Sequence, residues 1–159
     1  RRDGIAAVTL CRGSTSVAYA DAPWLLGGVK TLSYAINMAA QREAGRRGAA
    51  EVIFYSTDGL VLEAPTATVV WRNGMTLCTT PIGDSGILAG TTAGLLFDNA
   101  AASGWRTEVT TARVADLRAA ESLWLISATR GPVDVVVLDG AARPRDLERT
   151  ATVRGWCGF

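Results

Sequence analysis

Lys30 lies in an apolar, glycine-rich stretch, Leu25-Leu26-Gly27-Gly28-Val29-Lys30-Thr31, just ahead of a predicted helix. Most lysines are solvated, but this setting offers no clear polar face, so we expect the ε-amine to be sheltered from water. Desolvation favours the neutral form of an amine, and a neutral amine can attack an aldehyde. The alternative is an ordinary surface lysine. A phosphate-loop interpretation of residues 28–31 is excluded, because the required glycine spacing and Gly-Lys pair are missing.

Glu63 is the second residue with chemical potential. It follows the apolar residues 60–62, and Ala64-Pro65 interrupts strand pairing directly after it. The carboxylate could face water, or it could face the ring nitrogen of a cofactor. Opposite charges about 4 Å apart at an effective dielectric of about 20 attract by about 4 kcal/mol before desolvation. A ring nitrogen kept protonated in this way is the electron sink that carbanion chemistry requires.

A third candidate is a site for an anion. The glycine-rich residues 86–90 lead into Thr91, Thr92 and an apolar-periodic stretch at 93–102. Free backbone N–H groups, two hydroxyls and the positive end of a helix dipole would suit a phosphate. The alternative is an ordinary helix start, because threonine is a common N-cap residue.

Composition narrows the possible chemistry. The chain has no histidine, which excludes Ser-His and Cys-His pairs, so catalysis must use lysine, a carboxylate, tyrosine or a cofactor. Cys11, Cys78 and Cys157 are far apart and lack C-x-x-C spacing, so we expect no zinc or other metal site and a reducing cytoplasm. With a net charge of +1 and no long apolar run, neither nucleic acid nor a membrane is an expected partner.

The surrounding patterns predict the elements that position these residues. Strands are predicted at 5–10, 107–114, 123–127 and 133–138, and helices at 32–46, 93–102 and 116–121, the last capped by Asp116. Turns at 57–59 and 73–74 predict a four-stranded meander over 51–79, and the tail from Pro144 reads as a fraying helix. These elements predict one α+β domain with a closed or nearly closed sheet.

In this order, the lysine, the glutamate and the threonine-flanked helix start resemble the large domain of fold-type IV pyridoxal-phosphate enzymes. That family includes branched-chain aminotransferases, D-amino acid aminotransferases and aminodeoxychorismate lyases. The resemblance runs from about Ile5 to Gly140 and implies a D-amino acid aminotransferase-like pseudo-barrel of mostly antiparallel strands with flanking helices. It also implies pyridoxal 5'-phosphate as the cofactor.

The resemblance assigns roles to individual residues. Residues 30–34 resemble the segment in which a lysine holds the cofactor as a Schiff base, and Tyr34 is implied to contact the ring hydroxyl. Residues 57–63 resemble the strand that brings a glutamate to the pyridine nitrogen, which would be Glu63. The implied phosphate cup has Leu88 packing on the ring, with the phosphate at Gly90, Thr91 and Thr92.

Some positions depart from the family pattern. Ser127-Ala128-Thr129-Arg130 stands where the family has a threonine-rich turn, which implies that Ala128 and Thr129 lie at the cofactor. Arg130 could bind a substrate carboxylate through its guanidinium, or it could be a solvated turn residue. Residues 64–68 replace the usual glycine, serines and asparagine. The small N-terminal domain of the family is missing from this sequence, so residues 1–159 are interpreted as the large domain alone.

Within the family, the Lys-Thr-Leu-Ser-Tyr segment and Pro65 are most similar to actinobacterial aminodeoxychorismate lyases. The implied reaction converts 4-amino-4-deoxychorismate to 4-aminobenzoate and pyruvate, in folate biosynthesis. A class IV aminotransferase acting on branched-chain or D-amino acids needs the same lysine, glutamate and cup. A non-catalytic or truncated fragment is the third possibility. The resemblance further implies a homodimer.

Overall fold

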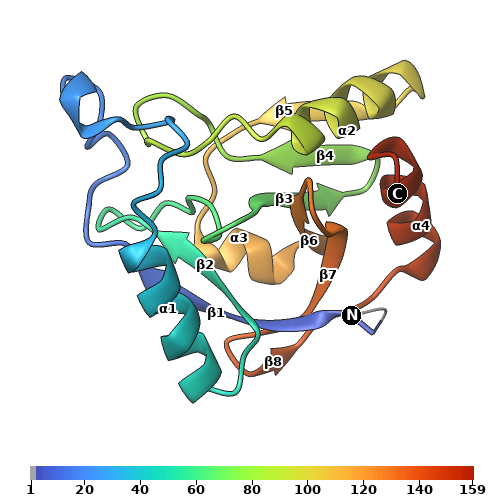
Figure 1. Cartoon of the computed structure of the whole chain (residues 1–159). Coiled ribbons are helices and arrows are strands. Elements are labelled where there is room, and N and C mark those ends of the chain that lie inside the picture. The colour runs from blue at the N-terminus through green and yellow to red at the C-terminus, as the bar shows by residue number, and fades with distance from the viewer. Residues whose placement is uncertain (1–2) are drawn as a thin grey trace.

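The computed structural model describes residues 3–159, which form a curled sheet flanked by helices (Figure 1). The strands are β1 Ile5–Cys11, β2 Glu51–Tyr55, β3 Thr68–Asn73, β4 Thr76–Thr79, β5 Arg106–Val109, β6 Ser122–Ser127, β7 Gly131–Leu138 and β8 Ala141–Ala142. The helices are α1 Ala35–Arg46, α2 Thr91–Ala102, α3 Val114–Ala119 and α4 Leu147–Trp156, and Pro23–Leu25 forms a short 3-10 turn.

The sheet is mixed, with the strand order β2-β1-β7-β6-β3-β4-β5 and β8 added to β7. Strand β1 runs parallel to both β2 and β7, β4 runs parallel to β5, and the remaining pairs are antiparallel. The predicted α+β class is confirmed, but the four-stranded meander is wrong. The first predicted hairpin does form: residues 60–63 return antiparallel to the end of β2, with the Phe54 N–H donating to the Glu63 carbonyl at 3.0 Å and the Leu62 N–H to the Phe54 carbonyl at 2.8 Å. The meander does not continue from there, because β3 pairs with β4 and β6, and β2 pairs along its other edge with β1.

The β3–β4 hairpin is confirmed, with a turn displaced by one residue. Asn73 pairs with Thr76, so the two loop residues are Gly74 and Met75. Gly74 has a φ of 57°, a conformation that glycine adopts without steric cost. The local signal therefore located the hairpin correctly and its turn only approximately.

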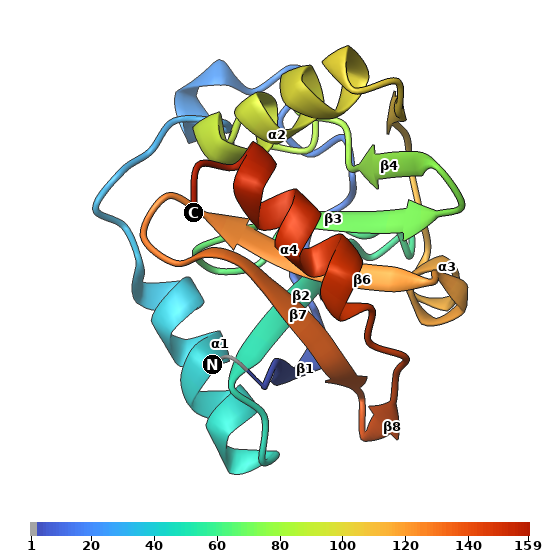
Figure 2. The same cartoon turned by 90° about the vertical axis from the view of Figure 1, so that its right-hand side faces the viewer.

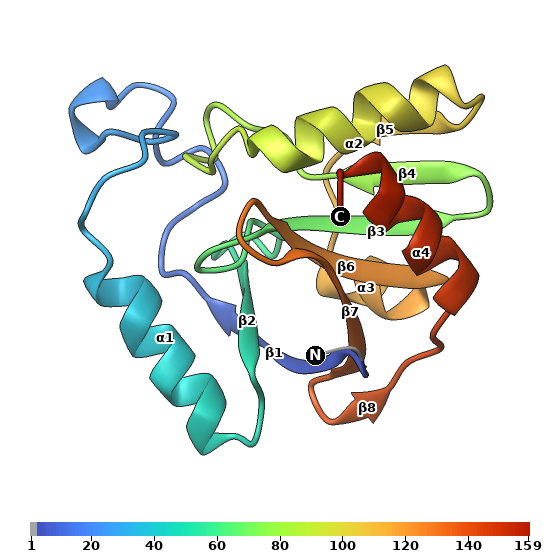
Figure 3. The ribbon, with the colours of Figure 1, turned by 45° about the vertical axis from the view of Figure 1, so that its right-hand side comes forward.

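Side chains on the two faces of the curled sheet belong to different hydrophobic cores. On β3, Val69 belongs to the core of the inner face, which also contains Leu117 of α3. Its neighbour Val70 points to the opposite face, where α2 and α4 pack together. A third core forms where α1 covers β1 and β2, around Phe54. Figures 2 and 3 show α2 and α4 side by side over the sheet, with α1 at a separate place.

Helix α1 begins three residues later than predicted, and its buried face overlaps only in part with the apolar face expected from the sequence, which consisted of Leu32, Ala35, Ile36, Ala39 and Ala40. Leu32 is 98% exposed and Ile36 is 55% exposed. Ala40 is buried as expected, together with Ala44, and both pack in the core that contains Phe54. Small side chains let the helix approach the strands closely, so alanines rather than large residues make this interface.

The last two helices are both predicted from the sequence, and α3 differs from expectation in its capping. In α3, Asp116 is the third residue and not the N-cap, and its carboxylate accepts a hydrogen bond from the Arg113 N–H at 2.7 Å. The predicted C-terminal helix, α4, is confirmed and is packed into the fold: Val153 is fully buried, and Thr150 accepts a hydrogen bond from the Trp124 indole at 3.0 Å. Across residues 3–159, the helices are too short or too polar to cross a bilayer.

Candidate functional site

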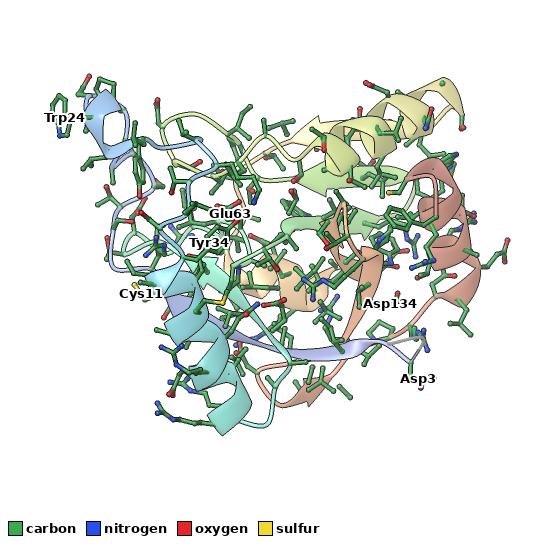
Figure 4. All side chains as sticks on the ribbon, in the orientation of Figure 1. Asp3, Cys11, Trp24, Tyr34, Glu63 and Asp134 are labelled. Atoms are coloured by element: carbon green, nitrogen blue, oxygen red, sulfur yellow. The ribbon has the colours of Figure 1, made fainter. Side chains whose placement is uncertain are left out.

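A cavity of about 250 Å³ lies where the start of α1, the end of β2 and the loop before α2 meet. Four of the residues predicted from the sequence line it: Lys30, Tyr34, Glu63 and Leu88. Figure 4 shows Tyr34 and Glu63 near each other at this end of the molecule, with Trp24 at the outer tip of the connection that precedes α1. Residues far apart in the sequence thus converge on one concave surface.

Lys30 is anchored at the cavity by Tyr34. Its Nζ atom donates a hydrogen bond to the Tyr34 hydroxyl at 2.5 Å and lies 5.1 Å from the centre of that ring. The expected shelter from water is wrong, because Lys30 is exposed in the described structure. Its apolar neighbours Leu26 and Val29 are 53% and 54% exposed, so the stretch around the lysine is not part of a core.

Glu63 is a half-buried carboxyl at the opposite wall of the cavity. Its Oε2 atom accepts a hydrogen bond from the Leu88 backbone N–H at 3.2 Å. Burial raises the pKa of Glu63 to about 7, although the Leu88 hydrogen bond and the charges of Arg12 and Lys30 act in the opposite direction. Near neutral pH this carboxyl can therefore either hold or release a proton.

The raised pKa of Glu63 makes the stability of the cofactor-free protein depend on pH. Because the folded state binds this proton more tightly than the unfolded state, stability falls as pH rises from about 4.5 to about 7. The Glu63→Gln variant lacks this ionisation. We expect it to match the wild type at pH 4 and to be more stable by about 1 to 2 kcal/mol at pH 8.

Urea unfolding of both proteins without added cofactor, repeated from pH 4 to pH 8, measures this difference. Glu43→Gln is the matched control, because the pKa of Glu43 is lowered by its hydrogen bonds with Arg47 and Arg46. Its effect should have the opposite pH dependence. A Glu63→Gln difference that stays constant across the range would contradict the prediction.

The predicted phosphate residues, Gly90 to Thr92 and Ala128 to Thr129, do not line the cavity. Gly90 precedes the first residue of α2, and no side chain caps this helix start. A side chain at position 90 would overlap Thr68 Oγ1, so glycine permits a close approach of α2 to β3. Thr68 pairs with Ile126, which lies just before the 127–130 turn. The start of β3 therefore brings the α2 N-terminus and the β6–β7 turn together.

In that turn, the Ser127 and Thr129 hydroxyls lie 3.4 Å apart. Thr91, Thr92, Ala128 and Thr129 are absent from the cavity lining among the described residues. Their predicted part in holding a phosphate stays a prediction.

Arg130 is engaged in a network that the sequence did not indicate. Its guanidinium donates to Glu51 Oε2 at 3.0 Å and to Thr66 Oγ1 at 3.1 Å. Glu51 is fully buried, and Gln41 of α1 donates to its other oxygen at 3.1 Å. The solvated-turn interpretation of Arg130 is wrong, and its predicted role at a substrate carboxylate gains no support. Instead, Arg130 ties the β6–β7 turn to β2.

Breaking this pair should destabilise the fold. Arg130→Ala leaves the Glu51 charge buried without its partner, and we expect the free energy of unfolding to fall by about 3 kcal/mol. The double variant Arg130→Ala/Glu51→Gln should recover part of the loss, because the stranded charge is gone. Arg46→Ala is the control: its pair with Glu43 is exposed, and we expect a change of about 0.5 kcal/mol or less. Denaturant unfolding measures all three, and equal losses for Arg130→Ala and Arg46→Ala would contradict the prediction.

Sequence reasoning missed Arg12 and Phe54 in the cavity wall, whereas Asn37 belongs to the segment that resembles the Schiff-base lysine segment. The Arg12 guanidinium lies 5.3 Å above the Phe54 ring, and both residues line the cavity. Asn37 of α1 donates to the Pro65 carbonyl at 2.8 Å and so holds the turn after Glu63. Arg12 directly follows β1 and Phe54 lies near the end of β2. The parallel β1–β2 pairing that would have brought these ends together was not recognised in the sequence.

A curled mixed sheet that brings a lysine and a glutamate to one cavity is the arrangement implied for fold-type IV enzymes. Comparison with protein families agrees: the model of the family described as "Amino-transferase class IV" matches residues 7–138. The chain belongs to this family, which confirms the resemblance stated from the sequence.

Among curated proteins, the chain is 44% identical over 151 residues to the "Bifunctional aminodeoxychorismate lyase / D-amino acid transaminase" of Mycobacterium tuberculosis. This match covers 91% of the chain and 52% of the relative. It is also 33% identical over 100 residues to the "Aminodeoxychorismate lyase" of Bacillus subtilis, covering 63% of the chain and 34% of that relative. The chain spans about half the length or less of the curated relatives it matches.

Solved structures give the same fold. A fold IV transaminase from Curtobacterium pusillum matches with a TM-score of 0.92 and 44% identity, over 98% of this chain and 52% of that one. The pyridoxal-phosphate-bound form of a hypothetical aminotransferase from Mycobacterium tuberculosis matches with a TM-score of 0.93 and 43% identity, over 98% and 55% of the two chains. The expected large-domain fold is confirmed, as a mixed sheet curled into a half-barrel.

Proposed function

We propose that this chain is the cofactor-binding part of a pyridoxal-phosphate-dependent aminodeoxychorismate lyase. The observation that supports this most strongly is the convergence of Lys30, Tyr34, Glu63 and Leu88 on one cavity. The names of both curated relatives described above include aminodeoxychorismate lyase. Because the chain spans about half of the Mycobacterium tuberculosis relative, the proposed activity is that of the whole protein.

The side chains at the cavity suit pyridoxal 5'-phosphate. An exposed amine on Lys30 can bond the aldehyde carbon, and the Tyr34 hydroxyl beside it can contact the ring hydroxyl. Glu63 lines the same cavity with a pKa of about 7, and within residues 3–159 it forms no ion pair, which suits a basic ring nitrogen. Leu88 supplies an apolar surface for the ring.

We assign the phosphate to the start of α2 and the β6–β7 turn. The start of α2 offers unpaired backbone N–H groups and the positive end of a helix dipole. The residues proposed to hold the phosphate are Gly90, Thr91, Thr92, Ala128 and Thr129.

When bound, pyridoxal phosphate supplies an electron sink for negative charge that develops at the reacting carbon. Glu63 would hold a proton at the ring nitrogen and so maintain that sink. Lys30 would hold the cofactor, and its amine, when not bonded to the cofactor, would move protons at the reacting carbon. Tyr34, as the hydrogen-bond partner of Nζ, keeps the amine directed into the cavity. Release of pyruvate then leaves 4-aminobenzoate.

A class IV aminotransferase is the second candidate function. The name of the Mycobacterium tuberculosis relative also includes D-amino acid transaminase, and transfer of an amino group would use the same lysine and glutamate. Branched-chain amino acids are the other substrate class proposed from the sequence. Only the residues around the substrate would separate the lyase from these transaminases.

A direct assay decides between these functions. Purified protein is incubated with pyridoxal phosphate and aminodeoxychorismate, and separately with 2-oxoglutarate and either D-amino acids or branched-chain L-amino acids. Formation of 4-aminobenzoate and pyruvate supports the lyase. Glutamate formed without any 4-aminobenzoate overturns the lyase in favour of the transaminase. A colourless preparation that takes up no cofactor supports a non-catalytic or truncated fragment.

The homodimer and the cytoplasmic location also stay proposals. Apolar side chains near the cavity, including Trp24 and Leu32, are 73% and 98% exposed, which is consistent with a further protein surface covering them. Light scattering coupled to size exclusion would give the oligomeric state, and a monomer across the micromolar range would contradict the dimer.

A further inference from the structure

The connection of residues 12–34 carries Lys30 but contains almost no regular structure. Its one regular element is the short turn at Pro23–Leu25. Lys30 can act on a cofactor only if this connection is held at a fixed distance from the loop that presents Leu88. Something other than secondary structure must therefore set the width of the cavity.

The Tyr19 ring lies between two glycines that belong to these two segments. A Cβ atom built on Gly27 would lie 2.5 to 2.8 Å from Tyr19 side-chain atoms, and one built on Gly86 would lie 2.5 Å from Tyr19 Cε2. Real Cβ atoms almost never come this close to a neighbour. The ring is thus held between bare backbone on both sides, and all three residues line the cavity.

Two backbone hydrogen bonds join the same two segments, the connection of residues 12–34 and the loop before α2. The Tyr19 N–H donates to the Asp84 carbonyl at 3.1 Å, and the Gly28 N–H donates to the Gly86 carbonyl at 2.8 Å. Lys30 follows Gly28 by two residues, and Leu88 follows Gly86 by two residues. The Leu88 N–H in turn reaches Glu63 at 3.2 Å. Tyr19 therefore sits where the lysine segment and the Glu63-contacting loop are joined.

We infer that Tyr19 is a positioning residue, a spacer between Gly27 and Gly86 that sets how far Lys30 stands from Leu88 and Glu63. The inference rests on the proposed cofactor site and goes beyond it, because it assigns the width of the cavity to one aromatic ring. A wider or narrower gap would change the fit of any planar ring bound between these walls.

The test is a double-variant cycle. Gly27→Ala inserts a methyl group against the Tyr19 ring, and position 27 has no positive φ, so the clash with Tyr19 is its main cost. We expect the affinity for pyridoxal phosphate to fall about tenfold, and the absorption maximum of the lysine-bound cofactor to shift. In Tyr19→Ala/Gly27→Ala the ring atoms are gone and only the Tyr19 Cβ, 2.8 Å from the added methyl group, remains, so the Gly27→Ala change should cost much less in Tyr19→Ala than in the wild type. Tyr19→Phe keeps the ring and should bind like the wild type.

Two further variants sharpen the comparison. Gly86→Ala also meets the Tyr19 ring, but position 86 has a φ of 72°, so Tyr19→Ala should rescue it only in part. Gly45→Ala in α1 has no atom within 4 Å of the added Cβ and is the matched control. Its cofactor affinity should equal that of the wild type.

The outcomes separate the spacer from the proposed function. If the wild type takes up no cofactor, the proposed function fails. The double-variant cycle can then still be measured through the thermal midpoint of the cofactor-free protein, which tests the contact between Tyr19 and Gly27. Additive losses for Gly27→Ala and Tyr19→Ala would overturn the spacer. If the wild type does bind the cofactor, changes in thermal midpoint with affinity and absorption maximum unaltered would also overturn the spacer, because Tyr19 would then act on stability and not on the site.

Discussion

Lys30→Ala is expected to abolish covalent cofactor capture and to lower turnover by about 10³-fold or more. The variant removes the amine that bonds the aldehyde and also the group that moves protons at the reacting carbon. Lys30→Arg should fail in the same way, because a guanidinium stays protonated and cannot condense with an aldehyde. The two variants together separate the loss of a positive charge from the loss of a nucleophilic amine.

The sequence makes the site of covalent capture unambiguous. Lys30 is the single lysine among the 159 residues. After borohydride reduction, a cofactor adduct can lie only on Lys30 or on a terminal α-amine, and peptide mass mapping distinguishes the two. Arg42→Ala removes an exposed cation of α1 and serves as the control, with capture and turnover unchanged. A borohydride-stable side-chain adduct in Lys30→Ala would remove Lys30 from its proposed role.

Glu63→Ala is expected to keep covalent capture but to lose most turnover, by about 10² to 10³-fold. An attraction of about 4 kcal/mol between a carboxylate and a protonated ring nitrogen corresponds to about 10³-fold in rate, and partial solvation of Glu63 reduces it. The remaining site can still bond the cofactor, because Lys30 and Tyr34 are unchanged. The loss should therefore appear in kcat more than in cofactor content.

Single-turnover kinetics and absorbance titration test this second prediction. Without Glu63, the bound ring nitrogen should lose its proton at a lower pH, and the spectrum should report that shift. Glu43→Ala, which removes the carboxylate of a half-buried glutamate on α1, should leave both measurements unchanged. Unaltered turnover in Glu63→Ala would rule out the proposed contact with the ring nitrogen.

Local sequence signals located residues of the cavity and the start of α2 better than they located the pairing of the strands. The glycine-rich residues 86–90 lead into α2 at Thr91, as predicted, because glycines and threonines mark a helix start through short-range chemistry. Glu63 was found through Pro65, which interrupts the ladder. The pairing of β1 with β2 and β7 could not be found in this way, since Ile5 and Val135 are brought together by the whole fold.

The same reasoning explains the errors at individual side chains. The partner of Arg130 is Glu51, which lies 79 positions earlier in the chain, so no local pattern could reveal the pair. The apolar residues around Lys30 suggested burial, but they are exposed because the connection they belong to runs over the surface. An apolar composition predicts burial only where the residues lie in a helix or strand that packs against the core.

The pairing of β1 with β7 has a consequence for biosynthesis. In the sheet, β1 and β2 are connected to the remaining strands only through the pairing of β1 with β7, and β7 ends at Leu138. A nascent chain can form the β3–β4 hairpin early, but β1 and β2 cannot join the β3–β6 part of the sheet until β7 has emerged from the ribosome. The sheet beneath the cavity is therefore expected to be completed late in the synthesis of these residues.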